Sequence, residues 1–163
     1  RARQTHKVYA ALVMGRWPVN RKVIDLPLVR GHDAQGARHV RVEAHPTEKD
    51  PKGHGAARRS ITKVKIEREL STHTLLEVTI ETGRTHQIRV HLAHEGNAIV
   101  GDPKYGDFAA NHALARGPMR FARMFLHAHR IAFDHPDSGQ RLVLESPMPA
   151  ECLRLLEQLT PPA

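Results

Sequence analysis

The residues best suited to chemistry lie together at positions 83–91, which read Gly-Arg-Thr-His-Gln-Ile-Arg-Val-His. Guanidinium, hydroxyl, imidazole and amide groups bind phosphates and the edges of bases. This stretch supplies all four kinds of group, in Arg84, Thr85, His86, Gln87 and Arg89. It therefore favours a site for an anion or a nucleic acid. The alternative is a solvated helix start with scattered histidines.

The sequence on either side predicts how these side chains are positioned. Residues 75–80 nearly alternate between apolar and polar, which predicts a strand that ends before Gly83. Thr85 is a suitable N-cap, and Ile88 and Leu92 recur at helical spacing before the helix stop at Gly96. The pattern predicts a strand, a tight turn and a short helix. Exposed backbone N–H groups at the helix start would add to the attraction for an anion.

The rest of the chain contains more strand-like than helix-like patterns. Period-two or continuous apolar patterns predict strands over residues 6–15, 60–70, 126–133 and 141–145, and a short strand within 97–106. The last segment, 150–159, predicts a helix with an apolar stripe of Leu153, Leu156 and Leu159. We therefore expect an α+β fold with a mixed, mainly antiparallel β-sheet and a few helices.

The overall charge points to a polyanionic partner. Twenty-five Lys and Arg against 17 Asp and Glu give a formal net charge of +8 and a pI near 10.2. Nucleic acid is the commonest partner of such a basic chain. Cys152 is the only cysteine, which excludes a disulfide within the chain and fits a cytoplasmic setting. No apolar run approaches the length of a membrane span, so we expect no membrane partner.

A basic loop is predicted between residues 45 and 59, where Pro, Gly, Lys and His occur without periodicity. Its cations, Lys49, Lys52, Arg58 and Arg59, are suited to phosphate groups. A solvated loop that makes no such contact explains the same composition equally well.

Thirteen histidines raise the alternative of a metal-dependent enzyme. His91 and His94 share a helix face, but zinc sites need three or four convergent ligands, and no cysteine lies nearby. His127 and His129 share a strand face without an obvious third ligand. The sequence therefore disfavours a metal site, and we assign no metal ligand.

Three segments resemble motifs of one enzyme family. The stretch 83–91 resembles the signature of the pseudouridine synthases that act on large-subunit ribosomal RNA, in the group of synthases A, C and D. Lys7-x-Tyr9-x-Ala11-x-Val13-x-Gly15 resembles the second motif of that family, and Phe125-Leu126-His127-Ala128 resembles the third. The three motifs occur in the family's order, and the resemblance covers nearly the whole chain.

The resemblance implies a function and a set of site residues. It implies isomerisation of uridine to pseudouridine in large-subunit (23S) ribosomal RNA, without metal, cofactor or nucleotide, by a monomeric cytoplasmic enzyme. Arg89 would pair with the catalytic aspartate, Tyr9 would lie against the target base, and Leu126 would form the floor beneath it. The RNA-binding residues would be Lys7, Arg84, Thr85, His86, Gln87 and His91.

One part of the family pattern is absent. The family's nucleophilic aspartate belongs to a His-Arg-Leu-Asp segment before the tyrosine motif, and none of the eight residues before Tyr9 is acidic. We therefore expect residues 1–163 to be the C-terminal portion of a single catalytic domain, inactive on its own. Arg89 would then be solvated, bound to an anion or paired with a substitute acid. Asp102, in a Gly-Asp-x-x-Tyr-Gly segment, is expected to form a turn before Pro103.

The resemblance also predicts that Tyr9, Arg89 and Leu126 converge on one cleft. Besides the metal-dependent enzyme, a non-catalytic RNA-binding module with the same fold remains an alternative function.

Overall fold

The structure is a computed structural model, and it describes residues 5–43 and 57–159. Its main feature is a six-stranded sheet in the order β2-β5-β6-β1-β7-β8, in which every described strand pair is antiparallel. The strands are β1 (His6–Met14), β2 (Val23–Asp25), β5 (Ile61–Glu69), β6 (His73–Ile80), β7 (Leu126–Asp134) and β8 (Arg141–Glu145). A separate hairpin pairs β3 (Leu28–His32) with β4 (Arg38–Val42). The expected α+β fold with a mainly antiparallel sheet is confirmed.

The central strand β1 is buried on both faces of the sheet. Ala11 and Val13 belong to one apolar cluster and Leu12 to another, as the alternation of side chains across a strand requires. All three side chains are fully buried. This double burial explains why the sequence of β1 is a continuous apolar run rather than an alternating one.

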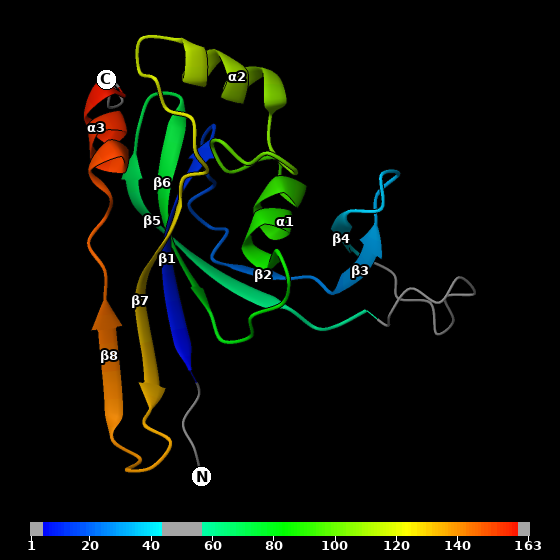
Figure 1. The fold of residues 1–163 in the computed structure, drawn as a ribbon, viewed down its shortest axis with the longest axis vertical. Helices are drawn as coiled ribbons and strands as arrows, with labels where there is room; N and C mark the ends of the chain where they lie inside the picture. The colour runs from blue at the N-terminus through cyan, green and yellow to red at the C-terminus, as the bar shows by residue number, and fades with distance from the viewer. Residues whose placement is uncertain (1–4, 44–56, 160–163) are drawn as a thin grey trace.

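Helix α1 (Gln87–His94) packs between the sheet and the β3–β4 hairpin (Figure 1). Ile88 and Leu92 contact the sheet in the cluster that contains Ala11 and Val13. Val90 points the other way, into a small cluster with Leu28 and Val40 of the hairpin. The helix therefore fixes the position of the hairpin relative to the sheet.

The opposite face of the sheet is covered by α3 (Ala150–Gln158), with α2 (Phe108–Arg116) at one end of the molecule (Figure 1). The predicted apolar stripe on α3 is partly wrong. Leu156 and Leu159 are buried in the core, but Leu153 is 49% exposed. Cys152 and Leu155 are buried instead, because they occupy the side of the helix that contacts Phe125 and its neighbours.

Two local predictions need correction. The short strand expected within 97–106 is only an isolated bridge between Ile99 and Val13, followed by turns. Within 31–39, Gly and His residues suggest a turn throughout, but the ends of β3 and β4 extend into this range and flank a shorter turn. The strands expected over 60–70, 75–80, 126–133 and 141–145 and the helix after Gly83 are confirmed, and the strands pair as the hairpins β5–β6 and β7–β8. None of the helices in the described residues is long and apolar enough to cross a membrane.

Candidate functional site

The chain enters α1 through a left-handed residue, not through the expected threonine cap. His86 occupies the N-cap position with φ 55° and makes no capping bond with its side chain. The turn before the helix is closed by Gln87, whose Oε1 accepts hydrogen bonds from the Arg84 backbone N–H and the Thr82 hydroxyl. Thr85 as N-cap is therefore wrong, because the helix begins one residue later and the His86 carbonyl accepts its first hydrogen bond, from the Val90 N–H at 3.0 Å.

Gln87 and His91 belong to a buried hydrogen-bond network. Gln87 donates to the Ile61 carbonyl and to Thr62 Oγ1, at 2.9 and 3.1 Å. His91 Nε2 lies 2.8 Å from the Leu26 carbonyl, and Nδ1 lies 2.7 Å from Thr62 Oγ1. A carbonyl only accepts, so Nε2 must donate and Nδ1 accepts from the threonine hydroxyl. This arrangement fixes a neutral histidine tautomer.

The network ties α1 to the sheet and to the segment that leads into β3. Gln87 and His91 are 2% and 0% exposed, so a ligand cannot reach their side chains without breaking these bonds. Desolvation lowers the pKa of His91, in spite of its bond to the Leu26 carbonyl. The prediction that these two residues contact RNA gains no support from their positions.

Arg89 forms a bidentate ion pair with Asp102. Arg89 Nε and Nη2 donate to Asp102 Oδ2 and Oδ1 at 2.9 and 2.8 Å. The Asp102 side chain is 1% exposed and that of Arg89 is 15% exposed. Of the three states expected for Arg89, the structure contains the pairing with a substitute acid.

Asp102 also forms the turn that its sequence predicts. Its Oδ1 accepts the backbone N–H groups of Lys104 and Tyr105 at 2.9 and 3.0 Å. Burial would raise the pKa of Asp102, but the hydrogen bonds from Arg89 and from these two N–H groups outweigh it and hold the pKa below its usual value. The bond to Asp102 raises the pKa of Arg89. Both groups are therefore charged at neutral pH.

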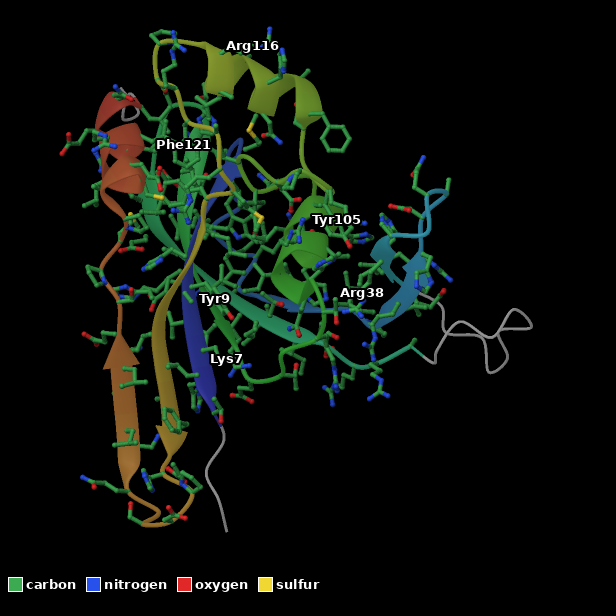
Figure 2. All side chains as sticks on the ribbon, viewed as in Figure 1. Lys7, Tyr9, Arg38, Tyr105, Arg116 and Phe121 are labelled. Atoms are coloured by element: carbon green, nitrogen blue, oxygen red, sulfur yellow. The ribbon has the colours of Figure 1, made fainter. Side chains whose placement is uncertain are left out.

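Tyr105 connects the ion pair to the hairpin and to His86. Its hydroxyl accepts the Val40 backbone N–H at 3.0 Å and lies 2.7 Å from His86 Nδ1. The Arg89 guanidinium lies over its ring, 5.1 Å from the centroid. In Figure 2, Tyr105 lies beside α1, on the side of the helix that faces the β3–β4 hairpin, and Arg38 lies in that hairpin. Desolvation, followed by the nearby cations Arg89 and Lys104, lowers the pKa of His86 and favours its neutral form.

Tyr9 and Leu126 lie on the face of the sheet that α1 covers. Leu126 pairs with Ala11 in the sheet, and both Tyr9 and Leu126 pack against the cluster that contains Ile88 and Leu92. Tyr9 also borders a surface hollow of about 280 Å³ that includes Lys7. The structure thus brings Tyr9 and Leu126 to the side of the sheet where Arg89 lies, while the Arg89 guanidinium is turned toward Asp102 and Tyr105. Their convergence on a single cleft stays a prediction.

The remaining predicted RNA-binding residues are accessible. Lys7, Arg84, Thr85 and His86 are all partly exposed, and the Lys7 ammonium lies against Gly83 at the turn before α1. Arg58 and Arg59 of the predicted basic loop are exposed, and Arg59 forms an ion pair with Asp25. Lys49 and Lys52 lie outside the described residues. Across residues 5–43 and 57–159, no three His, Cys, Asp or Glu side chains are arranged to hold a metal ion.

Sequence reasoning missed the contributions of Asp102 and Tyr105 to this site. Both belong to the Gly-Asp-x-x-Tyr-Gly segment, which by its sequence indicates only a turn. The available signal was the presence of a carboxylate and an aromatic residue shortly after an unpartnered arginine. The spacing in sequence does not reveal that the turn folds back onto the start of α1.

Comparison with known proteins adds to this geometry. Residues 1–94 match the family model described as RNA pseudouridylate synthase. The chain is 35% identical to "Ribosomal large subunit pseudouridine synthase C" of Salmonella typhi and of Escherichia coli strain K12, each over 98% of this chain and 46% of the relative. It therefore spans about half the length of these curated relatives.

Two solved structures share the fold. "Human RNA Pseudouridylate Synthase Domain Containing 4" gives a TM-score of 0.66 at 21% identity, over 98% of this chain and 64% of that one. "Human RNA Pseudouridylate Synthase Domain Containing 1" gives a TM-score of 0.63 at 24% identity, over 90% and 56%. The family model covers more than half of the sequence, and both structures have the same architecture. The chain belongs to the RNA pseudouridylate synthase family.

Proposed function

We propose that the full-length protein containing this chain isomerises uridine to pseudouridine in large-subunit ribosomal RNA. The observation that carries the proposal is the placement of Arg89 in the first turn of α1, held by Asp102 near the partly exposed Arg84 and His86. The names of the relatives at 35% identity support the same activity and substrate. The basic balance of the chain fits an RNA substrate.

Arg89 is suited to hold a second carboxylate. Asp102 uses its Nε–H and one Nη2–H, so the Nη1 edge of the guanidinium remains for another acceptor. We propose that this edge binds the nucleophilic aspartate, supplied by a part of the full-length protein outside these 163 residues. Asp102 then acts as a positioning residue, since it fixes the rotamer of Arg89 before the RNA binds.

Pseudouridine formation breaks the N-glycosidic bond, turns the uracil over and rejoins it to the sugar through carbon. The uridine must first leave the helical stack. In our proposal Tyr9 stacks on the extruded base and Leu126 forms the apolar floor, while Lys7, Arg84, Thr85 and His86 contact the RNA. Gln87 and His91 hold the turn that presents them. We further propose a monomer that acts in the cytoplasm and needs no cofactor.

The test is an assay of the full-length protein on an unmodified transcript of large-subunit ribosomal RNA, with pseudouridine detected by mass spectrometry. We expect pseudouridine with the unaltered protein. In Arg89→Ala we expect a loss of turnover of about a thousandfold, since the nucleophilic aspartate that Arg89 is proposed to bind would no longer be oriented. The control is Arg116→Gln, an exposed arginine on α2. Absence of pseudouridine with well-folded protein, or full activity in Arg89→Ala, would overturn the proposal.

A further inference from the structure

A pocket of about 200 Å³ lies between the β3–β4 hairpin and the loop before α1. Three arginines from separate segments line it: Arg30 of β3, Arg58 ahead of β5, and Arg84 of the loop. Leu28 and Val40 form its apolar part. This volume exceeds what a single water molecule needs, so the pocket has room for a small hydrated anion.

The backbone fixes the positions of these arginines. Arg30 lies directly opposite Val40 in the hairpin, so the two side chains share one face. Arg58 is joined to Leu28 by two backbone hydrogen bonds of 2.9 Å. Arg84 is anchored by its backbone N–H on Gln87 and by its Nε on the Arg59 carbonyl, at 3.2 and 3.4 Å. The pocket is thus assembled by the fold from distant parts of the chain.

The pocket lacks negative charge. No carboxylate and no aromatic ring is among the lining residues that the structure describes. Within the described residues, Arg30, Arg58 and Arg84 form no ion pair, whereas Arg59 pairs with Asp25 and Arg89 with Asp102. Three neighbouring cations repel one another unless an anion lies between them. Guanidinium forks match the oxygens of a phosphate group, and the lack of a ring to stack on makes a nucleobase a poorer occupant.

The pocket is connected to the candidate site. Thr85, which lines it, directly precedes His86. Val40 lines it too, and the Val40 backbone N–H donates to the Tyr105 hydroxyl that bonds to His86. A phosphate held here would belong to a strand that passes the start of α1. We propose that Arg30, Arg58 and Arg84 form a binding site for one phosphodiester group of the RNA strand, an inference that rests on the proposed function.

The test measures the affinity of the full-length protein for a large-subunit ribosomal RNA fragment at several salt concentrations. We expect Arg30→Gln and Arg84→Gln each to weaken binding roughly tenfold at low salt and to reduce the slope of log affinity against log salt by about 0.7–1. The RNA affinity of Arg84→Lys should lie between those of the unaltered protein and Arg84→Gln, since lysine keeps the charge but lacks the planar guanidinium fork. Arg116→Gln removes the same charge from α2 and should change affinity by less than about twofold.

A free phosphate ion is the competing source of the same chemistry. If the pocket binds an RNA phosphodiester, the pocket variants weaken RNA binding in buffer without phosphate, and inorganic phosphate displaces RNA from the unaltered protein better than chloride does at matched ionic strength. Pocket variants that all bind RNA as Arg116→Gln does would overturn the proposal, and if inorganic phosphate still stabilises the unaltered protein more than Arg30→Gln against unfolding, the pocket binds a free phosphate ion instead. If the unaltered protein makes no pseudouridine and binds no ribosomal RNA, the proposed function itself fails, which is a different result.

Discussion

The two halves of the stretch 83–91 have opposite environments. Arg84, Thr85 and His86 are partly exposed, and Arg84 borders a pocket without carboxylates among its described lining residues. Gln87 and His91 are buried, and every polar atom of their side chains is hydrogen-bonded to the protein. The polar residues of this stretch therefore have different roles, although they look equivalent in the sequence. The buried half builds the turn, and the exposed half is free to bind a ligand.

Arg89 lies between the buried residues Gln87 and His91, and its ion-pair partner Asp102 provides the largest expected effect on stability. Asp102→Ala leaves the half-buried guanidinium without its carboxylate and removes the acceptor for two backbone N–H groups. We expect a loss of about 3 kcal/mol in the free energy of unfolding. Chemical denaturation of the variant and of the unaltered protein measures it. A change below about 1 kcal/mol would show that the pair does not organise the site.

Gln87, His91 and Asp102 also show how far sequence reasoning reaches. Most strands and helices followed from local sequence patterns, because an element with one buried face repeats its apolar residues at its own period and the doubly buried β1 is continuously apolar. The partners of the polar residues did not follow, since Thr62 and Leu26 lie 29 and 65 positions from His91. The conformation of His86 was missed for a related reason: the left-handed turn is stabilised by Tyr105, which lies 19 positions away. Such distant contacts leave no local pattern in the sequence.

The pH dependence of stability tests the buried half directly. Desolvation lowers the pKa of His91 in the folded protein below the ordinary histidine value of 6.5. The unfolded chain therefore binds more protons as the pH falls through and below about 6.5, and the free energy of unfolding decreases by up to about 1.4 kcal/mol per pH unit from this group. At pH values well above about 6.5 the effect disappears.

Two histidines provide a matched comparison. We expect His91→Gln to flatten the dependence of the unfolding free energy on pH between about 7.5 and 5.5. His112→Gln on α2, where the side chain is exposed, should leave the dependence as it is in the unaltered protein. His73 and His86, whose pKa values are also lowered, contribute equally to both variants. Identical pH profiles for the two variants would refute the account of His91.

A smaller effect on stability is expected at Tyr105, which bonds to His86 and lies beneath the Arg89 guanidinium. Tyr105→Phe removes the hydroxyl that accepts the Val40 N–H and bonds to His86, while it keeps the ring beneath Arg89. We expect a loss of about 1–2 kcal/mol in the free energy of unfolding. Hydrogen exchange of the Val40 amide should become faster, and the amides of α3 serve as the internal control. Unchanged protection of Val40 would mean that this bond does not hold the hairpin.

The division of the stretch into a binding half and a structural half is tested most directly by one pair of variants with two readouts. The RNA affinity and the free energy of unfolding are measured for Arg84→Gln and for Gln87→Leu in the full-length protein. We predict that Arg84→Gln weakens RNA binding roughly tenfold and changes stability by less than about 0.5 kcal/mol. Gln87→Leu should lower stability by about 2–3 kcal/mol, because several buried groups lose their partner. The opposite pattern, or equal effects of both variants on both readouts, would contradict the division.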